Sequence, residues 1–275
     1  MALPILIKDH FSSYDTNGTL EDAIKEYKVS HHESNNLFHA TTEQSGSSVW
    51  FDHKKFRVGS SQIHTVVRAH QTNKKSLIRE ATQSITMTKV NNSTYLKKAM
   101  SHGIFFEPII KEIYQIIMSK KHTDFEYENF GVVVDPKHPF LASSIDGLAK
   151  CSCCKDGPRI VEIKAPYRLR HQKINQIKKK DPNFIVDRHG KLRTNHRYFD
   201  QVQYQMAILD GYDSVDLVVY TGIADFSKLS PSELGQHLLI ENIKRDHHYG
   251  DMQIKTANIF LREYVYPDLF LKPTG

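Results

Sequence analysis

Cysteine is scarce in this chain of 275 residues, and its three cysteines, Cys151, Cys153 and Cys154, fall within four positions. An odd, crowded set of this kind excludes the disulfide framework of a small secreted domain. Zinc and iron–sulfur sites usually have four protein ligands. We therefore interpret the cysteines as ordinary thiols of a hairpin loop. The alternative is a structural metal site whose fourth ligand is His122 or another of the 16 histidines, since the spacing selects none.

Long apolar runs are missing as well. No stretch reaches the roughly 20 residues that a membrane-spanning helix needs. The beginning, Met-Ala-Leu-Pro-Ile-Leu, lacks the basic residues that open a signal peptide. These absences predict an intracellular protein with no membrane association, and they do not distinguish the nucleus from the cytoplasm.

The composition is otherwise that of a globular protein. Hydrophobic residues make up 39 % of the chain, which is enough for a full core. Lysine and arginine number 37 against 31 acidic residues, a formal net charge of +6. This excess favours a polyanionic partner such as nucleic acid, although many basic proteins bind none.

The spacing of apolar residues predicts the secondary structure. Helices are expected over residues 20–28, 96–120, 198–209 and 252–264, and another runs through Val66 and Val67. The N-cap of the first is Asn17 or Thr19, and Ser60 or Ser61 caps the one through Val66. In the helix over 96–120, Gly103 predicts a break and Pro108 a restart. Strands are expected over residues 125–135, 140–148, 159–165, 214–221 and 236–243.

This order of elements predicts one α/β (α+β) domain with a central mixed β-sheet flanked by helices. Residues 1–48 read as an irregular, polar lead-in, and the chain divides into an N-terminal extension, 1–44, and a main domain, 45–275. The basic run at 178–180 is interpreted as a solvated loop, with contact to a DNA backbone as the alternative.

Two acids and a lysine lie on neighbouring predicted strands. Asp146 ends one strand, and Glu162 and Lys164 are two positions apart on the next, so their side chains point to the same face. Two carboxylates and an ammonium on one patch of sheet are the groups with which a hydrolase holds magnesium and activates water. The carbonyl of Ile163 offers a third oxygen ligand. Lys164 would orient or deprotonate the water. The alternative is a surface strand with an ordinary Glu/Lys pair.

Two further polar residues belong to helices. Glu107 falls on the apolar side of its helix, where a carboxylate is either paired or a metal ligand. Gln201 shares a helical face with Tyr204 and Gln205, and its amide suits the nucleophilic water or a phosphate. A first-turn acid and an amphipathic polar edge are the respective alternatives.

A basic cluster with serines precedes them. Arg57 offers a two-pronged donor to a phosphate, and Ser60 or Ser61 opening a helix adds a hydroxyl and backbone N–H groups. Trp50 lies just upstream. The alternative is a capped helix with an unrelated arginine.

These motifs occur in one order: Trp50 with Arg57-Val-Gly-Ser-Ser61, Gly103 with Glu107, Ser144-Ile-Asp146-Gly-Leu, Glu162-Ile-Lys164-Ala-Pro and Gln201-Val-Gln-Tyr. The series resembles the lambda exonuclease / YqaJ-like viral recombinase family, a branch of the PD-(D/E)XK nuclease superfamily with a restriction-endonuclease-like core. The resemblance covers roughly residues 45–225. Ile145 stands where the superfamily name has proline. Residues 1–44 and the cysteine insert have no counterpart.

The resemblance implies a role for each residue. Asp146, Glu162 and the carbonyl of Ile163 match the metal ligands, and Lys164 matches the catalytic lysine. Glu107 matches the helix glutamate near a second metal, and Gln201 the glutamine near the nucleophile. The pocket for a 5′-terminal phosphate is matched by Arg57, Ser144 and Ser61, with Ser60 in place of Ser61 if the loop aligns differently.

The resemblance also implies an activity. Members of this family are Mg2+-dependent exonucleases, with Mn2+ expected to substitute, and they degrade one strand of duplex DNA from 5′ ends in recombination or end processing. They form a ring-shaped homotrimer around double-stranded DNA and often partner a single-strand annealing protein. The alternatives are a PD-(D/E)XK endonuclease, a Cas4-like nuclease with an iron–sulfur cluster, and an inactive relative that only binds DNA ends.

Overall fold

The computed structural model describes residues 2–14, 18–88 and 93–271. Its helices are α1 (Ile7–Ser13), α2 (Leu20–Glu26), α3 (His31–Ala40), η1 (Gln44–Gly46), α4 (Ser48–Lys54), α5 (Ile63–Thr72), α6 (Lys75–Ile85), α7 (Thr94–Ser119), η2 (Tyr167–Leu169), α8 (Ile174–Lys180), α9 (Arg197–Ile208), η3 (Phe226–Lys228), α10 (Pro231–His237), α11 (His247–Tyr264) and α12 (Tyr266–Phe270). Its strands are β1 (Val58–Gly59), β2 (Glu126–Glu128), β3 (Val132–Asp135), β4 (His138–Ser144), β5 (Gly147–Lys150), β6 (Arg159–Lys164), β7 (Ser214–Tyr220) and β8 (Leu238–Lys244).

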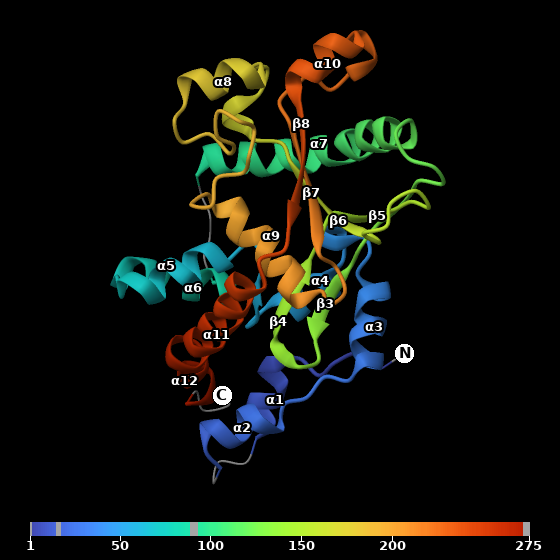
Figure 1. The fold of residues 1–275 in the computed structure, drawn as a ribbon. Coiled ribbons are helices and arrows are strands. Elements are labelled where there is room, and N and C mark those ends of the chain that lie inside the picture. Colours follow the sequence, from blue (N-terminus) through green and yellow to red (C-terminus); the bar gives the residue numbers. More distant parts are fainter. Residues whose placement is uncertain (1, 15–17, 89–92, 272–275) are drawn as a thin grey trace.

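The strands form two mixed sheets flanked by helices, as the α/β prediction expects (Figure 1). The smaller sheet has the order β1-β4-β3, and the larger has the order β2-β5-β6-β7-β8. The β1–β4 and β6–β7 pairs are parallel and the other pairs are antiparallel. The chain passes from the smaller to the larger sheet at Ile145-Asp146, between β4 and β5. The prediction of a single sheet is therefore corrected: β4 and β5 are separate strands at this crossing.

The larger sheet is buried on both faces. Along β6, Ile160 packs in a cluster with Val202 of α9, whereas Val161 and Ile163 pack with Ile110 of α7. Because side chains alternate along a strand, Glu162 and Lys164 share the face of Ile160. The helix α9 thus covers the face that carries Glu162, and α7 covers the opposite face.

The N-terminal region contains α1 and α3 beside the expected helix α2, and is therefore not an irregular lead-in. Ile7 and Phe11 of α1 lie one helical turn apart and are buried in the same cluster as Val58 and Phe260. Phe11 packs against Tyr266, and Arg262 of α11 pairs with Glu21 at 2.7 Å. The sequence does not predict α1, because polar residues surround its short apolar stripe. Thr19 caps α2 as expected, and Asn17 lies outside the described residues. The boundary between residues 44 and 45 stays a prediction.

The long helix α7 runs without a break through Gly103 and Pro108. Proline lacks the N–H that would bond four residues back, but Pro108 is exposed, so water can satisfy the freed carbonyl. The predicted break and restart are therefore wrong. Glu107 lies in the middle of the helix instead of at a first turn.

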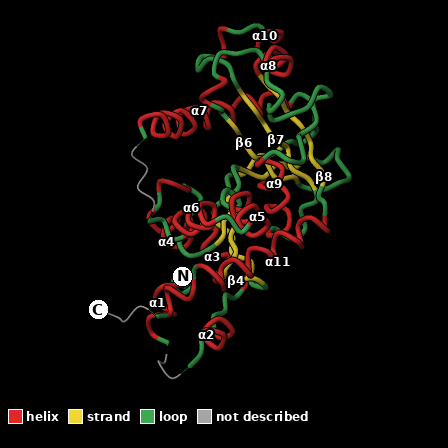
Figure 2. Tube along the Cα trace, turned by 90° about the vertical axis from the view of Figure 1, so that its left-hand side faces the viewer, coloured by secondary structure: helices red, strands yellow, loops and turns green. Residues whose placement is uncertain are grey.

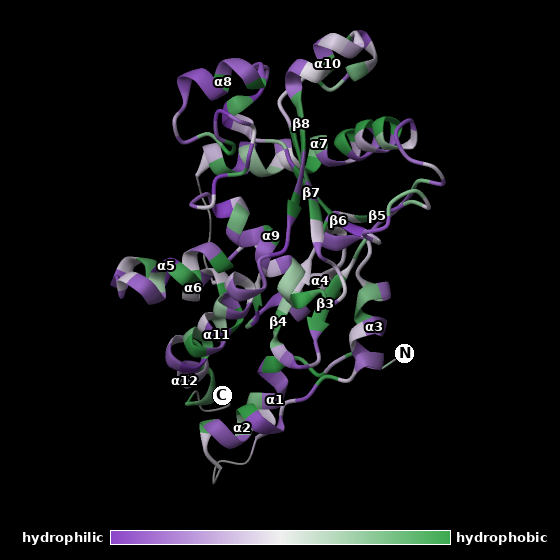
Figure 3. Ribbon diagram, viewed as in Figure 1, coloured by the Kyte–Doolittle hydropathy of each residue, from purple (hydrophilic) through white to green (hydrophobic). Residues whose placement is uncertain are grey.

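The remaining helices lie toward the two ends of the molecule. In both views α8 and α10 lie at one end, and α1 and α2 lie at the other (Figures 1 and 2). Lys178, Lys179 and Lys180 form the last turn of α8, so the predicted loop is a helix, and Figure 3 colours most of it hydrophilic. Among the described helices, none combines the length and the apolar character that crossing a membrane requires.

Candidate active site

Asp146 lies at the crossing between the two sheets. Its Oδ2 accepts a hydrogen bond of 2.7 Å from the backbone N–H of Ile163 on β6. Its own carbonyl accepts a 2.6 Å bond from the Tyr127 hydroxyl of β2. The Tyr127 ring passes so close to Gly147 that a Cβ there would lie 2.1 Å from the hydroxyl oxygen. The glycine after Asp146 is therefore required by the close packing that fixes this acid.

Glu162 is the central carboxylate of the site. It is 2 % exposed, and its Oε1 forms a short ion pair with Lys164 Nζ. Two amides of α9 complete its surroundings: Gln201 Nε2 donates to Oε1 and Gln205 Nε2 donates to Oε2, both at 2.6 Å. The two glutamines are four residues apart and share one helix face. The expectation that Glu162 and Lys164 project together is confirmed, and Gln201 lies beside them.

Glu107 approaches from α7 on the other side of the sheet. Its carboxylate pairs with Lys111 at 2.8 Å, one helical turn along. It is one third exposed, and its negative charge contributes to raising the pKa of both Asp146 and Tyr127. Glu107 thus lies within electrostatic reach of Asp146, with Lys111 as its direct partner.

Lys54 of α4 is a site residue that the sequence did not suggest. Burial lowers the pKa of its ammonium to about 8, although the charges of Glu162 and Asp146 act in the opposite direction. Its Nζ lies 3.7 Å from the centre of the Trp50 ring, a cation–π contact. Trp50 Nε1 in turn donates to Ser144 Oγ at 3.2 Å. Lys54, Trp50 and Ser144 therefore form a connected group beside the acidic pair.

Arg57 occupies a different environment from the predicted one. It is fully buried, and its guanidinium donates to the carbonyls of Pro139 and His53 and to the hydroxyl of Tyr27. Burial lowers the pKa of this guanidinium, and the nearby Tyr27 and Tyr266 hydroxyls oppose the shift. These bonds connect the loop between α2 and α3, helix α4 and strand β4. Arg57 therefore has a structural role. Its phosphate contact stays a prediction that this placement does not favour.

The two candidate serines lie in the turn between β1 and α5. Ser60 is buried and Ser61 is exposed. Neither caps the helix, because α5 begins at Ile63 after Gln62, whose side chain accepts the Gly59 N–H at 2.7 Å. The prediction of a serine cap is wrong because Val58-Gly59 pairs with β4 and keeps the chain extended up to that point. Ser61 remains open to a ligand.

The electrostatics of the site centre on the two acids. Burial raises the pKa of Asp146 to about 8, and the adjacent charges of Glu162 and Glu107 add to the shift, while Lys164 opposes it. Burial lowers the pKa of Lys164, but Glu162, Tyr198 and Asp146 outweigh it, so that the net pKa lies above its usual value. Lys164 also lies 5.0 Å from the Tyr198 ring. Lys164 is thus the ammonium paired directly with Glu162, and Lys54 adds a second positive charge nearby.

The residues fit a divalent cation. Asp146 and Glu162 supply hard carboxylate oxygens, the ligands that Mg2+ prefers. Burial and the charge of Glu162 raise the pKa of Asp146, and a cation bound beside it would favour the charged carboxylate. The buried Oε1 of Gln205, next to Glu162, has no hydrogen-bond partner in the described part of the chain. The role of the Ile163 carbonyl as a ligand stays a prediction.

The described residues form a mixed α/β fold with a buried acidic site, and solved structures share this fold. An exonuclease from Laribacter hongkongensis, described as alkaline and called LHK-Exo, superposes with a TM-score of 0.55 at 22 % identity, covering 81 % of this chain and 94 % of that one. The shutoff and exonuclease protein of Kaposi's sarcoma-associated herpesvirus gives a TM-score of 0.53 at 13 % identity, covering 91 % of this chain and 77 % of that one. Identities this low show the shared fold.

The family follows from the sequence match. Residues 49–222 match the YqaJ-like viral recombinase domain, and the chain belongs to this family. No curated protein sequence matches it. The resemblance drawn from the ordered motifs is thereby confirmed.

Proposed function

We propose that this protein is a Mg2+-dependent DNA exonuclease that degrades one strand of duplex DNA from 5′ ends. The observation that carries the proposal is the placement of Glu162, which Lys164, Gln201 and Gln205 hold next to Asp146. The family match and the fold shared with exonucleases support it. The net positive charge of the chain suits a nucleic-acid substrate.

Asp146 and Glu162 would hold the metal, with Ile163 and Glu107 as the further ligands that the family resemblance implies. Bound there, Mg2+ would polarise the phosphodiester and stabilise the leaving oxygen, and Mn2+ would substitute. Lys164 stays protonated near neutral pH because Glu162 raises its pKa. It therefore acts through its charge and its N–H donors, orienting water and offsetting phosphate charge, and not as the base. Gln201 and Gln205 keep the Glu162 carboxylate in place.

Digestion of linear and circular duplex DNA with Mg2+ tests the activity. We expect the linear duplex to be degraded and the covalently closed circle to remain intact, because an exonuclease needs an end. Cleavage of the circle would assign an endonuclease instead. Binding of linear DNA without degradation would assign a protein that only recognises DNA ends.

The 5′-terminal phosphate is recognised beside the acidic pair. Lys54 brings a positive charge there, and Ser144 accepts from Trp50, so that its own hydroxyl hydrogen can turn to a ligand. Exposed Ser61 is a further contact, and the adjacent Ser60 is buried. Charge-assisted contacts of this type position a phosphate strongly. Arg57 supports the segment that carries Lys54 from the protein interior, because it donates to the carbonyls of His53 and Pro139.

Lys54→Ala should lower the preference for 5′-phosphorylated over 5′-hydroxyl ends by about tenfold or more, the equivalent of one charged hydrogen bond. Initial digestion rates on the two kinds of end measure this ratio. Lys55→Ala, a change of the neighbouring lysine of the same segment, is the matched control and should leave the ratio unchanged. Equal rates on both ends by the unmutated protein would refute the pocket.

Arg57→Ala distinguishes a structural role of Arg57 from direct contact with the phosphate. Removing a fully buried side chain that donates to two carbonyls and Tyr27 should destabilise the fold by about 3 kcal/mol or more. A variant that unfolds at the usual temperature yet loses the preference for phosphorylated ends would instead return Arg57 to the phosphate pocket.

The protein assembles as a homotrimer around duplex DNA and partners a single-strand annealing protein, as the family resemblance implies. The first half of α7 exposes apolar side chains that suit a subunit contact: Tyr95, Leu96, Met100, Ile104 and Phe105. Light scattering should give three times the chain mass of 31.7 kDa, and Phe105→Asp should reduce it. A single-chain mass at every concentration would contradict the trimer.

A further inference from the structure

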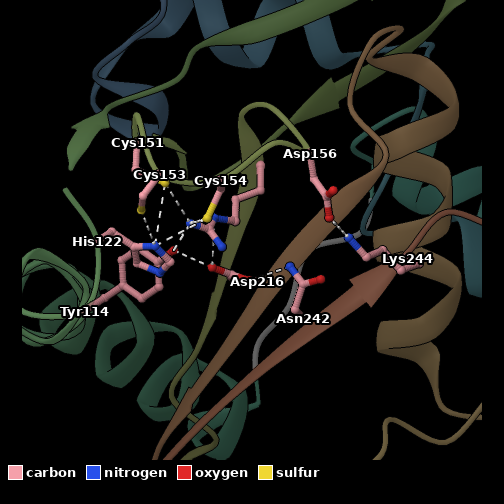
Figure 4. Close-up of polar contacts among 10 residues, drawn as sticks. Tyr114, His122, Cys151, Cys153, Cys154, Asp156, Asp216, Asn242 and Lys244 are labelled. Carbon is pink, nitrogen blue, oxygen red and sulfur yellow. Dashed lines mark hydrogen bonds and ion pairs between the residues drawn. The ribbon is translucent and has the colours of Figure 1, made fainter. Parts of the chain in front are cut away.

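We propose that Cys151, Cys153, Cys154 and His122 bind one zinc ion that clamps the end of α7 onto the β5–β6 hairpin. The three cysteines lie in the turn of that hairpin, and His122 follows the last turn of α7. All four ligand atoms lie within 4.8 Å of one another, and within the described ranges this is the one group of three or more potential metal-binding side chains drawn so closely together. Figure 4 shows the three thiols turned toward the ring of His122.

The distances match a tetrahedral zinc site. Sγ of Cys151 lies 3.6 Å from His122 Nδ1, and those of Cys153 and Cys154 both lie 3.4 Å from it. Zinc bonds of about 2.3 Å to sulfur and about 2.0 Å to nitrogen, at tetrahedral angles, place these atoms about 3.5 Å apart. The observed separations are those of two ligands that share one ion.

Hydrogen bonding does not account for this geometry. A single imidazole nitrogen carries either one hydrogen or one lone pair, so it can make only one hydrogen bond. Three thiols around the same Nδ1 therefore leave two contacts unexplained. A cation that converts the thiols to thiolates and binds Nδ1 directly explains all three at once.

The surroundings supply the charge and the donors that such a site needs. Three thiolates and a neutral imidazole around Zn2+ carry a net charge of −1. Arg159 Nη2 lies 3.6 Å from Cys151 Sγ and 3.8 Å from Cys154 Sγ, and the Thr123 N–H lies 3.4 Å from Cys153 Sγ. Donors of this type orient thiolate ligands and offset their charge.

Arg159 is itself held in position. Its Nε lies 3.6 Å from Asp216 Oδ2, which accepts a 2.6 Å bond from the Tyr114 hydroxyl of α7. Asn242 donates to the other oxygen of Asp216 at 2.8 Å (Figure 4). With Nδ1 on the metal, Nε2 of His122 carries the hydrogen, so its 3.5 Å contact with Arg159 is packing.

The donor set selects zinc and a structural role. Three sulfurs and one nitrogen form a closed tetrahedral set with no position left for a substrate. A multi-iron cluster needs its protein ligands spread around several iron atoms, and ligand atoms within 4.8 Å of one another leave no room for it. The Cas4-like alternative is therefore not favoured. Asp146 directly precedes β5, and Glu162 lies on β6. The zinc ion would connect these two strands to α7, the helix that carries Glu107.

Metal analysis of the full-length protein, purified under reducing conditions without chelator, tests the site. We expect one zinc per chain, and its loss in His122→Ala and in the double variant Cys153→Ser/Cys154→Ser. Lys155→Ser, an exposed change in the same loop, should retain the zinc. Glu162→Gln should retain it too, which separates this site from the acidic one.

Cobalt spectroscopy covers the case in which a variant fails to fold. Co2+ added to the metal-stripped, unmutated protein should give the visible bands of a tetrahedral site and a thiolate-to-cobalt charge-transfer band. No zinc and no such bands in the unmutated protein would overturn the proposal. So would zinc retained by His122→Ala and the double variant, or iron with acid-labile sulfide in place of zinc.

Discussion

Lys164→Ala should reduce DNA degradation by at least about 10²-fold while leaving the protein folded and able to bind DNA. Among the residues that the structure describes, Lys164 is the one ammonium paired directly with Glu162, and nearby Glu162 and Asp146 raise its pKa so that it stays charged. Without it, the developing charge on the phosphate and the position of the water lose the cationic donor that Glu162 holds in place. Release of labelled nucleotides from linear duplex, together with a DNA-binding titration, separates catalysis from binding.

Lys150→Ala is the matched control. Lys150 is an exposed lysine at the other end of the same hairpin and pairs with Glu126 at the surface. Exposed pairs contribute little to stability, so this change should affect neither degradation nor folding. Degradation by Lys164→Ala at the rate of the unmutated protein would remove Lys164 from the active site.

Without magnesium, the protein should lose stability as the pH rises toward about 8, and Asp146→Asn should remove this loss. Burial raises the pKa of Asp146 from an ordinary 3.8 to about 8, so the folded state keeps a proton that the unfolded chain releases. Between these values the folded state binds more protons, and the free energy of unfolding falls by up to roughly 1.4 kcal/mol per pH unit. Asp146 therefore contributes its full stabilisation only below the pKa that its carboxyl has in the unfolded chain. This contribution is lost as the pH rises to about 8.

Magnesium should reverse this trend. The metal needs the deprotonated carboxylate, so its apparent affinity should rise up to about tenfold per pH unit until about pH 8. Denaturant unfolding with and without Mg2+, between about pH 6 and pH 9, measures both effects. Magnesium is omitted rather than chelated, because a chelator would also remove zinc.

Asp156→Asn is the control for this prediction. The exposed Asp156 bonds Lys244, which lowers the pKa of its carboxyl, so it adds no slope in this range. Equal pH slopes in Asp146→Asn and the unmutated protein would show that Asp146 does not hold a proton in the fold. Magnesium stabilising Asp146→Asn as strongly as the unmutated protein would show that the metal binds elsewhere.

The local part of the site was predictable from the sequence because it follows the period of a strand. Glu162 and Lys164 are two residues apart on β6, so they had to share a face once that segment was extended. The order of motifs predicts Gln201 as a site residue. Gln205 lies one helical turn further along the same helix face. Both glutamines bind the same carboxylate.

The rest depends on contacts between distant segments. Lys54 reaches the acidic pair because α4 packs against β3 and its Trp50 donates to Ser144 at the end of β4, and the sequence of α4 reveals neither contact. The sequence suggests Arg57 as a phosphate ligand, but in the fold it is buried and donates to Tyr27, a residue 30 positions away in the chain. His122 meets the cysteines only because α7 packs against the larger sheet. None of these partners has a spacing that selects it.

The most direct test of the central claim is digestion of linear duplex DNA labelled separately at each 5′ and 3′ end, with Mg2+, by the unmutated protein and by Glu162→Gln. We predict early release of the 5′ labels by the unmutated protein and no release by Glu162→Gln, with normal unfolding and DNA binding in both. Equal release by the two proteins would contradict the assignment of the active site, and early release of the 3′ labels would contradict the polarity.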